Sequence, residues 1–150
     1  MWLDAILAYL HFTAIFLLFA FLTVQVILIR QPLDMRTVRL LGRMDIWYFS
    51  SAIAALVTGF LRATVGAKGA DFYFNAWPIY VKIGLFLAVG LISVKPTMTF
   101  IRWKRMYERD AAWQVPALEQ ASMRRLVMVE VHLAALIPVF AVIMSRGLGH

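Results

Sequence analysis

The sequence predicts an all-α integral membrane protein, an up-down bundle of four transmembrane helices in a single domain over residues 1–150. Hydrophobic residues make up 63% of the chain and its mean hydropathy is +0.78, which is unusual for a soluble domain. The apolar residues form four runs, at about 3–29, 45–65, 78–101 and 126–145. The Lys and Arg residues behind the net charge of +7 gather between these runs, which is typical of membrane proteins.

The first span runs from Leu3 to Ile29. At 1.5 Å per residue it exceeds the roughly 30 Å hydrocarbon core of a bilayer. It carries Asp4, His11 and Gln25 at heptad spacings, so these three side chains share one face. Since an ionisable group is costly in lipid, we expect His11 to face the interior of the bundle.

The second span, 45–65, follows a basic turn at residues 30–43 and leads into a glycine-rich loop at residues 66–71. Ser51, Ala55 and Gly59 form a row of small side chains along it. Such a row lets a neighbouring helix or a flat cofactor approach, and close helix packing is the simpler explanation.

The third span begins with Trp77 and Pro78, where proline fits the first turn of a helix. Its apolar part is short, so we expect a kink at Pro96 and continuation through Phe100 and Trp103 to the membrane interface.

The fourth span, 126–145, contains Glu130, His132 and Pro138. Residues two positions apart on a helix point in directions about 200° apart around the axis, so Glu130 and His132 cannot face the same groove. Glu130 shares a smooth face with Ala134 and is the better candidate for the interior.

The two basic segments predict the orientation of the chain. They are expected to stay in the cytoplasm, which places both termini on the periplasmic side of a bacterial inner (cytoplasmic) membrane in a multi-pass protein. The first span lacks a basic leader and a small-residue cleavage site, so it is expected to be retained. The charge pattern argues against nucleic-acid binding, and the absence of cysteine excludes disulfides and thiolate metal sites.

Counting residues from the helix ends sorts the intramembrane polar groups into two layers. His11, Arg62 and Lys82 fall in the periplasmic half. A neutral imidazole can ligate haem iron and the two cations can pair with propionates, so these residues predict a haem b site with His11 as the metal ligand. The alternative is that His11 only hydrogen-bonds across helices while the two cations reach the headgroups.

The inner layer holds Asp45, Tyr48, Glu130 and His132, near Gln25 and Ser93. Glu130 is expected either to form an ion pair with Arg125 or Arg43 at the cytoplasmic end or to carry protons. The estimated depths of His11 and His132 differ by about 12 Å, so we do not pair them as two axial ligands of one iron. The Met residues are dispersed, which gives little support for a copper site.

Motifs along nearly the whole chain resemble a bacterial four-helix inner-membrane family of unknown function. They are His11, residues 43–48, residues 59–62, residues 66–73, Lys82 after Trp77-Pro78, residues 95–97, and Arg146-Gly. More distantly, His11, Lys82 and the helix containing Arg125, Glu130 and Pro138 resemble haem-containing protoporphyrinogen oxidases and CopD-like copper-resistance domains. That resemblance implies haem at His11. The chain departs from the oxidase pattern at Val129, where that pattern has Asn.

The leading hypothesis is therefore a b-type haem-binding membrane protein with a redox or porphyrin-related role. One alternative is an oxidoreductase resembling protoporphyrinogen oxidase, which would need an acceptor such as quinone. Others are a copper or small-solute permease or accessory protein using Glu130 and His132, and a non-catalytic membrane scaffold. The expected partners are the lipid bilayer, quinone or porphyrin, and a second copy of the chain.

Overall fold

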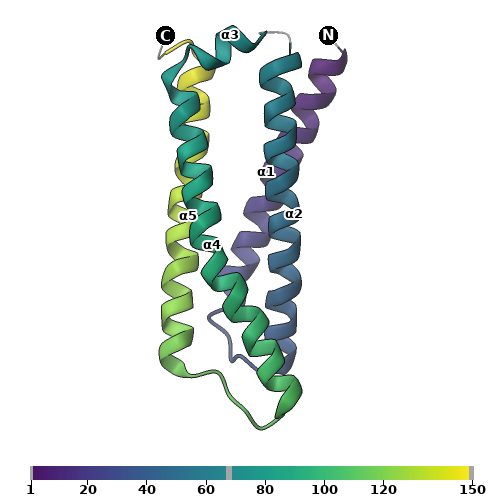
Figure 1. Ribbon diagram of the computed structural model, residues 1–150, viewed down its shortest axis with the longest axis vertical. Helices are drawn as coiled ribbons and strands as arrows, with labels where there is room; N and C mark the ends of the chain where they lie inside the picture. Colours follow the sequence, from purple (N-terminus) through teal and green to yellow (C-terminus); the bar gives the residue numbers. More distant parts are fainter. Residues whose placement is uncertain (1, 67–68, 149–150) are drawn as a thin grey trace.

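The computed structural model describes residues 2–66 and 69–148, and these form helices joined by short connections (Figure 1). Four helices are long and apolar enough to cross a membrane: α1 (Trp2–Leu28), α2 (Met35–Val65), α4 (Trp77–Arg109) and α5 (Ala117–Ser145). A short helix, α3 (Gly69–Phe74), links α2 to α4. The all-α prediction with four membrane-capable helices is confirmed.

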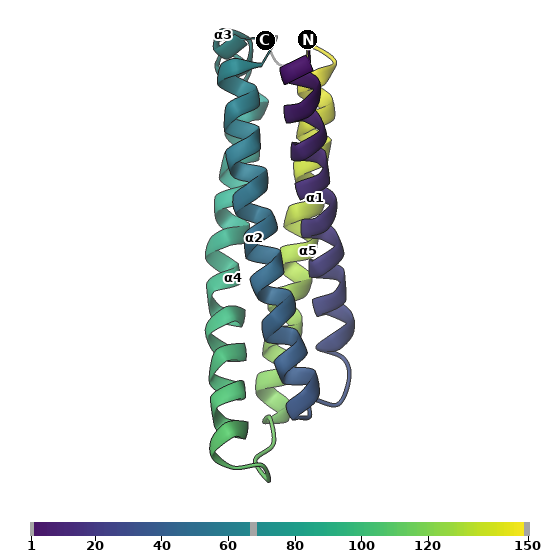
Figure 2. The same ribbon diagram turned by 90° about the vertical axis from the view of Figure 1, so that its right-hand side faces the viewer.

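The four long helices occupy the corners of a bundle. Figure 1 shows α1 beside α2 and α4 beside α5, and the perpendicular view in Figure 2 shows α2 beside α4 and α1 beside α5. The start of α1, the end of α5 and α3 lie at one end of the bundle, which we call the α3 end. The connections 29–34 and 110–116 lie at the other, which we call the basic end.

Three helices, α2, α4 and α5, extend further at the basic end than the predicted spans. The helix α2 begins at Met35 with the side chain of Asp34 as its cap, since a carboxylate oxygen of Asp34 accepts the backbone N–H of Thr37 at 2.7 Å. The same capping bond holds the pKa of Asp34 below its usual value. Arg, Lys, Met and Leu are good helix formers, so α2, α4 and α5 continue beyond the apolar segments that hydropathy detects.

The predicted glycine-rich loop at residues 66–71 needs correction. Its C-terminal part is the start of α3, because Gly69 to Phe74 form a helical turn with Asp71 near its N-terminus. Ala67 and Lys68 of that loop, and residues 149–150 of the predicted C-terminal segment, lie outside the described residues.

The larger buried apolar cluster lies in the half of the bundle nearer the basic end. It is built around side chains that are almost completely buried, including Leu22, Val38, Phe100, Trp103 and Val127. At the α3 end, the described residues form a smaller buried cluster of Ala76, Ile79 and Met144. The helices therefore pack most tightly near the basic end.

Two side chains tie the connection at residues 29–34 to the other helices. The hydroxyl of Tyr107 on α4 donates to the carbonyl of Leu33. The side-chain amide of Gln120 on α5 donates to the carbonyls of Ile29 and Gln31, at 2.9 and 3.1 Å. Carbonyls of the connection that follows α1 thus find hydrogen-bond partners.

The outward faces of the bundle are apolar. Phe16 on α1, Ile53 on α2 and Leu91 on α4 are exposed by 73%, 62% and 75%. Continuous apolar surface of this kind is unfavourable in water and matches a lipid bilayer. The predicted lipid environment agrees with this surface.

Candidate functional site

His11 lies against α2. Its Nδ1 is 3.1 Å from the hydroxyl oxygen of Thr58, and a Cβ added to Gly59 would lie 2.9 Å from its Cε1 atom. The imidazole ring therefore packs directly onto the bare backbone of Gly59. The row of small residues serves the close approach of α1, because any side chain at Gly59 would meet this ring.

The hydrogen bonds of Thr58 define the tautomer of His11. The hydroxyl of Thr58 donates its one proton to backbone carbonyls of its own helix, the shortest contact being 2.6 Å to Ala54. It can therefore only accept from the imidazole, which places the proton of a neutral ring on Nδ1. Nε2 then carries a lone pair and can act as a ligand, in the arrangement that metal-binding histidines use.

Arg62 and Lys82 lie close enough to His11 to act on it electrostatically, and they also act on each other. The guanidinium carbon of Arg62 is 5.4 Å from the centre of the Phe12 ring on α1, within the range of a cation–π contact. Its Nε is buried and has no hydrogen-bond partner among the described residues. The three residues predicted for the outer layer are thus brought together on α1, α2 and α4.

These residues fit a haem in two respects. The neutral imidazole of His11 offers a nitrogen lone pair, and two cations with an unsatisfied buried N–H match the carboxylates of propionates. Within the described part of the chain, no group of three or more His, Asp or Glu side chains could hold a metal ion by themselves. A metal at His11 would therefore take most of its ligands from elsewhere, as haem iron does from its macrocycle.

The inner layer forms a buried hydrogen-bond network between α2, α4 and α5. The hydroxyl oxygens of Tyr48 and Ser93 are 3.0 Å apart, and Ser93 Oγ is 3.0 Å from Oε2 of Glu130. All three side chains are at most 2% exposed. The predicted interior position of Glu130 is confirmed.

Asp45 lies beside this network and is also buried. The side-chain amide of Gln25 on α1 donates to its Oδ1 at a long 3.4 Å, and the Thr97 side chain on α4 approaches the same carboxyl group. Asp45 and Glu130 are near enough to interact electrostatically. Every long helix therefore contributes polar groups to this layer.

His132 lies apart from both layers. It is on an exposed face of α5, and its Nδ1 contacts the carbonyl of Met128 on the same helix at 2.6 Å. A polar path that uses both Glu130 and His132 is therefore not formed. The ion-pair alternative for Glu130 is not formed either, since the described salt bridges involve other acids and its second oxygen, Oε1, is buried without a partner in the described chain.

Sequence reasoning missed the acid that fastens α5 to α4 at the basic end. One oxygen of Glu119 accepts from Arg102 at 2.7 Å and from the indole N–H of Trp103 at 2.8 Å. Glu119 stands in a polar stretch beside Pro116, so its sequence context suggests only a solvated connection.

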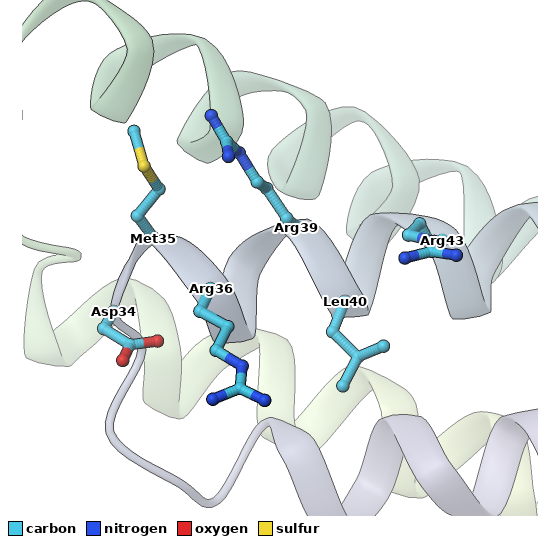
Figure 3. A pocket seen from close by; sticks show the side chains of 6 residues that line it. All are labelled: Asp34, Met35, Arg36, Arg39, Leu40 and Arg43. Carbon is cyan, nitrogen blue, oxygen red and sulfur yellow. The ribbon is translucent and has the colours of Figure 1, made fainter.

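Basic side chains line two open recesses at the basic end. The recess shown in Figure 3 has a volume of about 620 Å³ and lies along the start of α2, where Arg36, Arg39 and Arg43 spread around Met35 and Leu40. The other, of about 850 Å³, follows the last turns of α4. Mixed apolar and cationic surfaces of this kind suit the headgroup region of a bilayer.

Comparison with known proteins gives a family without an assigned activity. A family model described as "Predicted membrane protein (DUF2214)" matches residues 3–149, nearly the whole chain. No curated protein and no solved structure matches the chain.

Proposed function

Because the chain belongs to the DUF2214 family of predicted membrane proteins, we propose that it is a four-span membrane protein that binds haem b at His11, Arg62 and Lys82. Its role would be redox or porphyrin-related. Membership of an uncharacterised membrane family agrees with the sequence-based resemblance. The more distant likeness to protoporphyrinogen oxidases and CopD-like domains remains part of this proposal.

One observation carries the proposal. The ring of His11 is held through Nδ1 by Thr58 and also bonds the backbone of Ala55, and it lies within electrostatic range of Arg62, whose Nε–H is buried and unsatisfied among the described residues. If His11 served only to pack the helices, the neighbouring Arg62 would have no need to bury an unpaired N–H. Burying such a donor costs about 1–3 kcal/mol. An anionic ligand with a metal centre satisfies both groups at once.

The residues of the chain would have separate tasks. His11 would hold the haem iron, while Arg62 and Lys82 would bind the propionates. Bound haem supplies reversible one-electron chemistry. Thr58 acts as a positioning residue, because its hydroxyl fixes the tautomer and orientation of the imidazole.

The absorption spectrum of the protein purified in mild detergent tests haem binding. We expect a Soret band that His11→Ala abolishes and that added imidazole restores. His132→Ala is the matched control, since His132 is exposed and bonds only within its own helix, and it should leave the spectrum unchanged. A wild-type protein without a Soret band after haem is supplied would refute the proposal.

The enzymatic part of the proposal has its own test. A protoporphyrinogen oxidase should rescue growth of a bacterial strain that lacks this step, with quinone as the electron acceptor. If the protein binds haem and fails to rescue, the oxidase assignment is refuted and haem binding stands. Whether two copies associate can be read from the mass of the same purified sample.

The proposed topology places both termini on the periplasmic side of the bacterial inner membrane, with the basic end in the cytoplasm. The chain contains no cysteine, so single cysteines can be introduced without removing native ones. Ser145→Cys should react with a membrane-impermeant maleimide in intact spheroplasts, whereas Gln114→Cys should react only after lysis. The reverse pattern would overturn the topology.

A further inference from the structure

Ser93 stands at the centre of the inner network, and its contacts show where the protons lie. Its Oγ has three oxygen neighbours: the carbonyl of Val89 at 2.7 Å, the hydroxyl of Tyr48 at 3.0 Å and Oε2 of Glu130 at 3.0 Å. A serine hydroxyl has one proton to donate and two lone pairs that accept. All three contacts can therefore be hydrogen bonds only if two of the neighbours donate to Ser93.

The carbonyl of Val89 has no proton, so the two donors must be Tyr48 and Glu130. Ser93 then donates to Val89, which is also its shortest contact. In this arrangement Glu130 is a protonated carboxylic acid. An ionised Glu130 would take the proton of Ser93 and leave the contact with Val89 without one.

The surroundings of Glu130 agree with this proton count. Its side chain is 1% exposed, and Oε1 has no hydrogen-bond partner in the described chain. The titratable groups that interact with it are Asp45 and Tyr48, both on α2, while α4 presents Ser93 and no cation. An ionised carboxylate left in this setting would be strongly unfavourable, whereas a neutral acid is tolerated.

Polar groups flank this network along α2 and α4. Thr97 lies one turn beyond Ser93 toward the basic end, and Asp45 lies about one turn beyond Tyr48 in the same direction. Toward the α3 end, Ser51 lies about one turn beyond Tyr48 on α2 and its hydroxyl donates to the carbonyl of Trp47, while the nearest buried residue of α4 is Val89. Toward the basic end, the network is extended by the carboxyl group of Asp45 and the hydroxyl of Thr97, and the side chains of the larger buried apolar cluster follow.

We propose that Glu130, together with Asp45, Tyr48 and Ser93, forms a membrane-buried site that reversibly binds one proton. On release, the O–H bond of Glu130 breaks, the proton passes to solvent water, and Ser93 turns its own proton from Val89 to the carboxylate. The donor set consists of oxygen atoms alone, which suits a proton or another hard cation rather than a soft metal. This site is separate from His11 and does not depend on haem.

Infrared difference spectroscopy of the full chain in lipid nanodiscs tests the proposal. We expect a C=O stretching band of a protonated carboxylic acid that disappears as the pH is raised. Labelling all glutamate side chains with ¹³C should shift this band without any substitution. Absence of a titrating acid band, or a band insensitive to labelled glutamate, would overturn the proposal.

Variants then assign the band to one residue. Glu130→Gln keeps the size of the side chain and should abolish the band, whereas Glu108→Gln, at an exposed acid paired weakly with Lys104, should leave it unchanged. Persistence of the band in Glu130→Gln would refute the assignment. The titration is repeated with sodium and with N-methylglucamine as the only cation, and a midpoint that depends on sodium would replace the proton site by a sodium site.

Discussion

Replacing Gly59 by alanine tests the close packing between His11 and α2. A Cβ at this position would lie 2.9 Å from Cε1 and 3.4 Å from Nδ1 of His11, so the ring must move away and lose its hydrogen bond to Thr58. Overpacking costs about 1–3 kcal/mol and the lost hydrogen bond about 0.5–1.5 kcal/mol. Alanine in a helix offsets about 1 kcal/mol of this. The net expectation is a destabilisation of about 2 kcal/mol.

The chain provides matched controls for this substitution. A Cβ added to Gly84 or Gly90 on α4 meets no heavy atom within 4 Å. Alanine at either site should therefore stabilise the protein by up to about 1 kcal/mol. The free energy of unfolding is measured by SDS titration of mixed micelles, followed by tryptophan fluorescence. If Gly59→Ala is as stable as Gly84→Ala, the imidazole does not pack where the structure places it.

Substitutions at three further positions test the basic end. Glu119→Ala leaves the indole N–H of Trp103 without its partner and should cost about 1–3 kcal/mol in the same SDS titration, whereas Glu119→Gln retains an acceptor and should cost less than about 1 kcal/mol. Equal losses of stability in these two variants would contradict the role of Glu119 as the acceptor for Trp103. Tyr107→Phe removes the bond to the carbonyl at residue 33 and should destabilise the protein by about 0.5–1.5 kcal/mol, while an unchanged midpoint would argue against that bond. Asp34→Ala should speed hydrogen exchange at the amide of Thr37, and Asp34→Asn, which can also cap, should not. Because capping lowers the pKa of Asp34, its stabilising effect is present above the ordinary value of 3.8 and is lost as the pH falls through the lower folded pKa.

Hydropathy located the four membrane spans because the cost of exposing polar groups to lipid acts on every residue of a span. The helix ends at Met35, Arg109 and Ala117 were not predictable in the same way, since they lie beyond the apolar segments. There the chain stays helical through local propensity, capping by Asp34 and packing of Trp103.

The candidate site was likewise predictable from the sequence only in part. The 100° rotation per residue was enough to place Glu130 inside and to separate it from His132. It could not identify Ser93 as the direct partner of Glu130, or Thr58 as the partner of His11, because those contacts depend on how neighbouring helices are rotated and crossed. Helix rotation is set by packing across the bundle, which no single span encodes.

The pairing of polar groups has a consequence for biogenesis. Gln25 and Asp45 belong to the hairpin of α1 and α2, and Ser93 and Glu130 belong to the hairpin of α4 and α5. The contacts of Tyr48 with Ser93 and of Asp45 with Thr97 join the two halves. Each hairpin can thus enter the bilayer with its own acid already hydrogen-bonded, which lowers the cost of insertion. Docking of the preformed hairpins then needs the tyrosine and serine hydroxyls to meet, so their hydrogen bond reports whether assembly has reached the correct register.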